Sequence, residues 1–178
     1  MRSVAFLRAV NVGGRTVTMA ALVRLFGKMG FEHAQTFLAS GNVIFEAPAT
    51  SRDDLERRVQ SALSRALKYD VPVFVRTMPE IAAIAAYEAF DAADVASAEA
   101  FNVAFTASPL DRAERARVAA LATDLDRFHV HGAEVYWLCR VRQSQSTFNN
   151  AGLEKALGRR ATIRGLNTLR RLAQRYAE

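Results

Sequence analysis

Residues 3–30, "SVAFLRAVNVGGRTVTMAALVRLFGKMG", carry the pattern that decides the fold. Residues 3–9 form an apolar run typical of a strand, and residues 19–29 have apolar side chains at helical spacing. Thr18 is suited to cap the start of that helix, because its hydroxyl can accept a hydrogen bond from a free backbone N–H. Two glycines and an arginine stand at the joint, residues 13–15. A plain strand-to-helix turn needs fewer, so the joint is a candidate site.

The pattern continues downstream of this helix. Ser40-Gly41-Asn42 is flanked by two short apolar runs, which predicts a β-hairpin with Gly41 at the turn. Residues 51–67 predict an amphipathic helix that Ser51 caps, and residues 71–77 predict a strand. The resulting order, β-α-β-β-α-β, is that of a ferredoxin-like unit.

The same order of elements is expected over residues 100–164. A strand is followed by a helix from Ser108-Pro109 to about residue 122, then by a hairpin around Gly132-Ala133. A further helix, a short strand and an added amphipathic helix complete the chain. The fold class predicted is therefore α+β, with two ferredoxin-like (βαββαβ) halves packed together and a C-terminal helix. We expect domains at residues 1–88 and 99–178, with residues 88–98 as the connection.

The amino-acid composition limits where the protein can act and what it can bind. The 178 residues contain no apolar run long enough to cross a membrane and a single cysteine, Cys139, so no disulfide can form within the chain. We therefore expect a cytoplasmic protein with no membrane contact. The net charge of +6 would suit an acidic partner, nucleic acid included, but the abundance of arginine and alanine favours a compositional bias as its origin. No motif indicates a cofactor, and the sequence leaves enzymatic activity and oligomeric state open.

The joint has the chemistry of an anion-binding site. In a β-α-β-β-α-β unit the first and third strands are antiparallel neighbours, so the joint and the Ser-Gly-Asn segment should lie at the same edge of the sheet. Glycines allow a close approach to the backbone, a helix N-terminus offers free N–H groups, and arginines neutralise an anion. The alternative is that these residues only satisfy turn geometry. The candidate residues are Arg8, Asn11, Gly13, Gly14, Arg15, Ser40, Gly41 and Asn42.

The stretch from Phe6 to Ala47 resembles the opening of the mostly bacterial family called domain of unknown function 1697. Its members carry a Leu-Leu-Arg-Gly-Ile-Asn-Val-Gly-Gly stretch and a Thr-Tyr-x-x-Ser-Gly-Asn-Val hairpin. The family's ending, Thr-x-Arg-Asn-Trp-Asn-Thr, is also matched, although Gly165 and Leu166 replace the usual Asn-Trp pair. The resemblance implies two ferredoxin-like halves and no established activity. It extends the candidate ligand-binding set to Thr162, Arg164, Asn167 and Thr168, which we expect within reach of the first loops.

Other constellations point less clearly to chemistry. His129 and His131 share a strand face but lack a third metal ligand nearby, so we expect a surface pair and no metal site. Cys139 alternates with apolar residues and is expected to be a buried thiol. An RNA- or DNA-binding module is the alternative function, since RNA-recognition modules share this fold and stack bases on strand aromatics, for which Phe6 and Phe45 are the candidates. A structural or interaction protein without a ligand is the third possibility.

Overall fold

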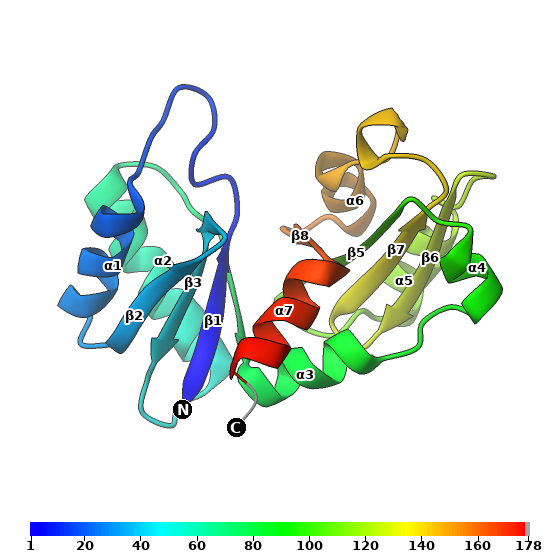
Figure 1. Cartoon of the computed structure of the whole chain (residues 1–178). Coiled ribbons are helices and arrows are strands. Elements are labelled where there is room, and N and C mark those ends of the chain that lie inside the picture. Colours follow the sequence, from blue (N-terminus) through cyan, green and yellow to red (C-terminus); the bar gives the residue numbers. More distant parts are fainter. Residues whose placement is uncertain (177–178) are drawn as a thin grey trace. The chain divides into compact units, whose positions relative to one another are not determined.

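The computed structural model describes residues 1–176, except for the side chains of Ala39 and Ser40. The chain divides into two compact units, Met1–Glu80 and Ile81–Glu178. Each unit contains one four-stranded antiparallel sheet, so the α+β class predicted from the sequence is confirmed (Figure 1). No helix in the described part of the chain is long and apolar enough to span a membrane.

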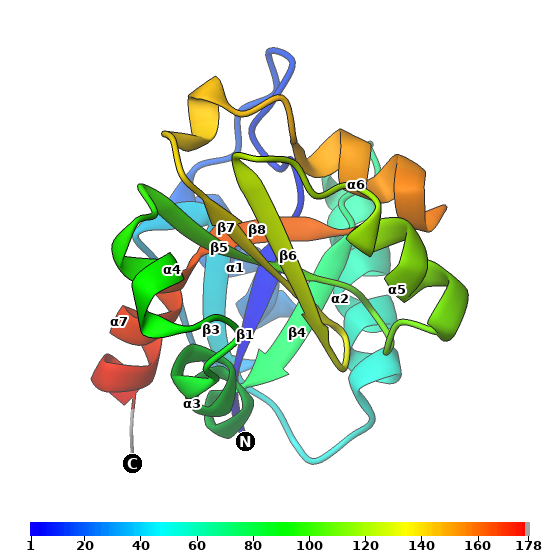
Figure 2. The same ribbon diagram turned by 90° about the vertical axis from the view of Figure 1, so that its right-hand side faces the viewer.

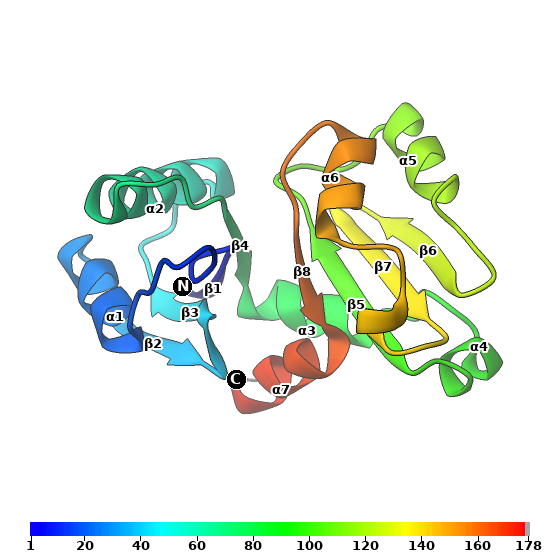
Figure 3. The same ribbon diagram turned by 90° about the horizontal axis from the view of Figure 1, so that it is seen from above.

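The first unit follows the expected order of elements. It comprises β1 (Arg2–Leu7), α1 (Met19–Lys28), β2 (Glu32–Phe37), β3 (Ala39–Glu46), α2 (Arg52–Leu67) and β4 (Val73–Thr77). The strands lie in the order β2-β3-β1-β4, and both helices cover the same face of the sheet (Figure 3). Helix α3 (Met78–Ala86) begins at the end of this unit and continues into the second.

Local chemistry explains where the two helices of the first unit begin. The Thr18 hydroxyl accepts a hydrogen bond from the N–H of Ala21 at 3.1 Å, and the Ser51 hydroxyl accepts one from Asp54, also at 3.1 Å. Both helices then bury an apolar stripe against the sheet, as their sequence periodicity predicts. The stripes and the facing strand residues form one core, which includes Leu22, Phe26, Phe45, Leu55, Val59, Leu63 and Val75.

The hairpin between β2 and β3 differs from the prediction. The chain turns at Leu38, which has a left-handed φ of 61°, whereas Gly41 lies inside β3. The sequence places Gly41 at the turn because glycine is the usual residue of a left-handed conformation. Here an exposed leucine takes that conformation instead, so strand pairing has decided the position of the turn.

The second unit repeats the order of the first. Its strands are β5 (Ala100–Phe105), β6 (Asp126–His131), β7 (Glu134–Cys139) and β8 (Thr162–Gly165), in the sheet order β6-β7-β5-β8 (Figure 2). Helices α5 (Arg112–Ala119) and α6 (Asn150–Leu157) contribute Val118, Leu153 and Leu157 to the core on one face. Helix α7 (Leu166–Tyr176) packs on β5 and β8, and the Tyr136 hydroxyl on β7 donates a hydrogen bond to the Ile84 carbonyl of α3.

Two boundaries in the second unit differ from the sequence-based prediction. Helix α5 begins at Arg112 because Asp111 caps it and Glu114 completes the capping box, whereas the sequence suggested a start at Ser108-Pro109. The division between the units falls after Glu80, and the segment expected to connect the domains, residues 88–98, contains the short helix α4 (Ala92–Ala96).

Buried charges lie at the edge strand of the first sheet. The N–H of Val75 on β4 donates to Glu56 at 2.7 Å, and its carbonyl accepts from Arg76 at 2.7 Å. Both side chains are buried and stand 3.8 Å apart. Burial raises the pKa of Glu56 to about 7, against the opposing effects of the Val75 hydrogen bond and Arg76. A buried glutamate–arginine pair thus satisfies backbone groups that the edge strand would otherwise leave unpaired.

Candidate anion-binding site

The candidate loop, residues 8–18, joins β1 to α1 and is fixed at both of its ends. The N–H of Arg8 donates to the Pro72 carbonyl at 2.9 Å, and the Tyr69 hydroxyl donates to the Val10 carbonyl at 2.6 Å. Val10 and Val17 are buried in the core of the first unit. All six residues between them, 11–16, are exposed. The loop is therefore a solvent-facing segment on firm anchors (Figure 1).

Asn11 holds this loop closed. Its side-chain carbonyl accepts a hydrogen bond from the N–H of Val17 at 2.6 Å, and its amide donates to the carbonyl of the same residue at 3.2 Å. Both polar ends of the side chain are thus used by one backbone position. Of the two roles that Asn11 could have, orienting a ligand or holding the loop, the structure shows the second.

The two glycines form the tip of the loop. Gly13 and Gly14 have φ values of +62° and +79°, and the N–H of Arg15 donates to the Val12 carbonyl at 3.2 Å. Two successive positive φ angles are accessible to glycine at little cost, which explains why both positions are glycine. No hydrogen bond from the N–H of Gly13 or Gly14 to any residue of the described chain is present. These two donors face solvent.

Arginines supply positive charge beside these donors. The guanidinium of Arg15 lies 4.4 Å from the centre of the Tyr69 ring, a cation–π contact that leaves its N–H groups available. No acidic side chain in the part of the chain that the structure describes pairs with Arg15. Arg8 is half-buried at the base of the loop. The arrangement can attract an anion to the glycine tip.

The Ser40-Gly41-Asn42 segment lies at the same end of the sheet as the loop. β1 and β3 are antiparallel neighbours, and Asn42 is the partner of Phe6 near the end of β1. The Asn42 amide is buried and donates to the Phe37 carbonyl at 3.0 Å, so it stabilises the β2–β3 turn. The Ser40 side chain lies outside the part of the chain that the structure describes. The predicted proximity of the segment to β1 is correct, and Asn42 acts within the hairpin.

The C-terminal candidates belong to the second unit. Thr162 is buried in β8, and its hydroxyl accepts a hydrogen bond at 2.8 Å from Arg164, which also donates to the Ile163 carbonyl. Asn167 and Thr168 lie in the first turn of α7, where Asn167 is exposed. The structure therefore places all four residues in the second unit. Their use in one site with the loop of the first unit stays a prediction.

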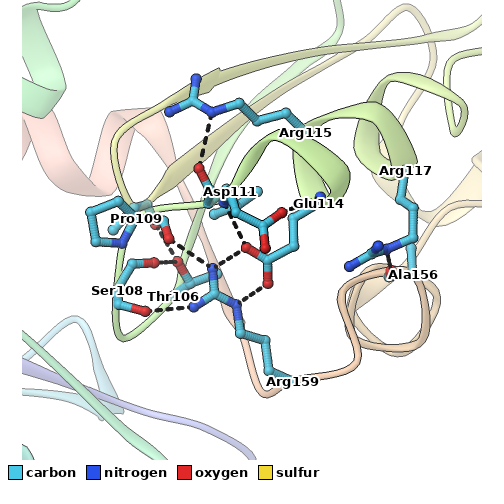
Figure 4. Close-up of polar contacts among 11 residues, drawn as sticks. Thr106, Ser108, Pro109, Asp111, Glu114, Arg115, Arg117, Ala156 and Arg159 are labelled. Atoms are coloured by element: carbon cyan, nitrogen blue, oxygen red, sulfur yellow. Dashed lines mark hydrogen bonds and ion pairs between the residues drawn. The ribbon is translucent and has the colours of Figure 1, made fainter.

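Several arginines of the second unit are already engaged with other residues. Arg159 forms an ion pair with Glu114 at 2.9 Å and donates to the Ser108 hydroxyl at 2.7 Å (Figure 4). Arg160 lies 3.9 Å from Glu154. Arg117 donates to the Ala156 carbonyl at 2.6 Å and so joins α5 to α6. These arginines have structural partners, which weakens the argument from net charge for an acidic ligand.

His129, His131 and Cys139 have packing roles. His129 is hydrogen-bonded to the Tyr87 hydroxyl at 2.9 Å, and His131 stacks on the Tyr87 ring at 4.2 Å. Burial, together with the charges of His131 and Arg115, lowers the pKa of His129. Cys139 is buried, as predicted, and burial raises the pKa of its thiol. A thiol held neutral in this way is a poor nucleophile.

Sequence reasoning missed Tyr69, which both anchors the loop and supports Arg15. Tyr69 stands beyond the end of α2, in a segment where the sequence pattern marks no site. Its distance from the loop along the chain explains why: only folding brings its hydroxyl to Val10. Sequence reasoning also missed Ala9. Its φ of 55° is a left-handed conformation that alanine rarely adopts, so the residue type gave no indication of it.

Comparisons with other proteins agree with this fold. Residues 1–136 match the family model described as a protein of unknown function (DUF1697). The chain is similar to the solved structure of the conserved bacterial protein SP0830 from Streptococcus pneumoniae, with a TM-score of 0.76 and 21% sequence identity over 99% of this chain and 98% of that chain. At this identity the likeness shows the fold alone. A search of curated proteins gives no match.

Proposed function

The chain belongs to the family of proteins of unknown function DUF1697, and we propose that it binds a small anionic ligand at the glycine tip of the 8–18 loop. The ligand class is a nucleotide, a phosphate or a carboxylate metabolite. Gly13 and Gly14 provide backbone donors, Arg15 provides the charge, and Arg8 lies at the base. Asn11 and Asn42 hold the surrounding backbone in place.

One observation carries the proposal. Two consecutive N–H groups with no acceptor in the described chain stand next to an arginine that has no acidic partner there. Backbone N–H groups and an arginine fork are the donors that proteins use for oxyanions. The Tyr69 contact holds the Arg15 guanidinium over a ring, which reduces the entropy that the side chain would lose on binding.

We also propose a finer fold class and a cellular location for the chain. We assign each unit to the ferredoxin-like class, because both combine the βαββαβ order with the second and fourth strands at the sheet edges. A single cysteine that is buried and cannot form a disulfide within the chain supports a cytoplasmic location. Anionic metabolites are abundant ligands of proteins in that compartment.

The nucleic-acid alternative loses support at both of its aromatic positions. Phe45 is fully buried, and its ring packs on Phe26 and Phe31 with centroid distances of 5.2 and 4.7 Å. A ring inside the core cannot stack on a base. Phe6 is also fully buried. We therefore rank the small anion above RNA.

The test compares Arg15→Ala with wild type in titrations with inorganic phosphate and with a panel of nucleotides and carboxylates. A charge-assisted hydrogen bond contributes about 1.5–3 kcal/mol, so Arg15→Ala should weaken binding roughly ten- to a hundredfold. Arg24→Ala is the matched control, because Arg24 is exposed on α1 of the same unit. Equal affinities in wild type and Arg15→Ala would refute the site.

Glycine variants separate a binding loop from a turn with no ligand. A Cβ at Gly13 or Gly14 would meet no atom within 4 Å, so the cost of alanine comes from the positive φ alone, about 1 kcal/mol for either variant. If melting curves show this loss while no panel anion raises the melting temperature of wild type, the loop is a structural turn only.

A further inference from the structure

The open end of the β2–β3 hairpin, opposite the turn, brings together three side chains with metal-binding atoms. A carboxylate oxygen of Glu32, a ring nitrogen of His33 and a carboxylate oxygen of Glu46 all lie within 4.8 Å of one another. Two ligands bound tetrahedrally to a zinc ion stand roughly 3.4 Å apart, given metal–ligand bonds of about 2.1 Å. Small rotations of these surface side chains would close the remaining distance.

A β-bulge explains how neighbours in sequence reach the same point. Glu32 is paired with Glu46, but the next pair is Gln35 with Ile44, so β2 has one more residue than β3 in this interval. His33 has a φ of 51° within that bulge. Consecutive side chains of a regular strand point to opposite faces. The bulge interrupts this alternation, so that Glu32 and His33 can both approach Glu46.

The charges at this point favour a cation. The paired positions Glu32 and Glu46 place two carboxylates directly opposite each other across strands, an arrangement that is destabilising without a counter-charge. Arg2 supplies one positive charge through Glu46, and the side chains of Glu32 and His33 form no hydrogen bond or ion pair within the residues that the structure describes. Two carboxylates and one arginine leave these acidic and basic groups with a net negative charge.

Arg2 occupies only one oxygen of Glu46. The two hydrogen bonds from Arg2 to Glu46, from Nε at 3.1 Å and from Nη2 at 2.9 Å, are both made to Oε1. The second oxygen, Oε2, can still bind a metal ion. Outer hydrogen bonds of this kind fix the orientation of ligating carboxylates in metal sites. Arg2 would thus be a positioning residue for Glu46.

We propose that Glu32, His33 and Glu46 form a binding site for a divalent transition-metal ion, with Arg2 orienting Glu46. One nitrogen and two oxygen ligands from the protein suit Zn²⁺, with water completing the coordination. The site is built entirely from the first unit. It stands on the hairpin and does not depend on anion binding at the 8–18 loop.

Isothermal titration of the full-length, metal-free protein with zinc chloride at pH 7.5 tests the proposal. We expect one site per chain. Glu32→Gln and His33→Asn should each weaken its affinity at least tenfold, and asparagine is chosen because it tolerates the left-handed φ of residue 33.

Two controls keep the outcome decisive. Glu88→Gln removes an exposed carboxylate of the second unit, and His131→Asn removes a histidine of the second unit; both variants should retain the wild-type affinity for zinc. Circular dichroism shows whether each variant is folded. If His33→Asn does not fold, the affinity of Glu32→Gln decides the outcome, because this substitution nearly preserves the shape of the side chain. Absence of zinc binding by the wild type, or unchanged affinity in Glu32→Gln, would overturn the proposal.

Discussion

At the scale of single residues, left-handed backbone conformations occur at both glycine and non-glycine positions. Gly13 and Gly14 adopt them where glycine is expected, but Ala9 and Leu38 adopt them as well. A side chain in this region of φ costs about 1–2 kcal/mol because Cβ approaches a neighbouring carbonyl oxygen. In the DUF1697 pattern that the chain resembles, glycine stands where this chain has Ala9. The chain thus keeps a backbone that its own residue does not favour.

We expect Ala9→Gly to stabilise the protein by about 0.5–1 kcal/mol, since relief of the strained φ of 55° exceeds the added entropy of the unfolded chain. Urea unfolding monitored by circular dichroism measures the change. Ala62→Gly, in the middle of α2, is the matched control and should lose about 1 kcal/mol. A loss of stability in Ala9→Gly would show that the alanine methyl group makes contacts that outweigh the strain.

At the scale of elements, edge strand β4 depends on a side chain that titrates near neutrality. Glu56 accepts the outward N–H of Val75 and lies beside Arg76, both within the first unit. Burial raises the pKa of Glu56 from 4.5 to about 7. The folded state therefore binds a proton that the unfolded state releases between these values. Through this group, stability is greatest below pH 4.5 and falls as the pH rises towards 7.

Replacing Glu56 by Gln should remove this dependence while keeping an acceptor for Val75. Between pH 4.5 and 7 the wild type should lose about 3 kcal/mol more than Glu56→Gln does, the linkage expected from the raised pKa. Urea titrations of both proteins across that range provide the comparison, with Glu88→Gln as the control for loss of an exposed carboxylate. Parallel pH profiles for wild type and Glu56→Gln would contradict the assignment.

At the scale of the whole molecule, the net charge of +6 overstates the charge available to a ligand. Arg159, Arg160 and Arg2 are held by Glu114, Glu154 and Glu46. Arg171 and Arg175, four residues apart on α7, are both exposed. Nucleic acid should therefore bind weakly, without sequence preference and mainly through such surface arginines.

We expect fluorescence anisotropy with labelled single-stranded RNA and duplex DNA to show binding that weakens steeply with salt. In the double variant Arg171→Ala, Arg175→Ala, the negative slope of log K against log salt should become shallower by about 1.5. Each lost phosphate contact reduces the magnitude of the slope by about 0.7–0.9. A tight complex that survives physiological salt would reverse our ranking and favour the nucleic-acid module.

Much of the architecture could be predicted from the sequence because local forces set it. The periodicity of Leu22, Phe26, Leu55, Val59 and Leu63 determined the buried faces of α1 and α2. Thr18 and Ser51 determined where those helices begin, because a cap acts over three residues of the chain. The Gly-Gly pair likewise marked a tight loop, since two positive φ angles in succession strongly favour glycine. Each of these signals is contained in a few neighbouring residues.

Only the tertiary structure decided the features that rest on distant partners. Pairing of β3 with both β1 and β2 moved the hairpin turn from Gly41 to Leu38 and created the bulge that joins Glu32 and His33 to Glu46. Tyr69 reaches Val10 and Arg15 across almost 60 residues of chain. In each case the free energy of many packed contacts outweighs a local preference of about 1 kcal/mol, so the local sequence does not reveal the outcome.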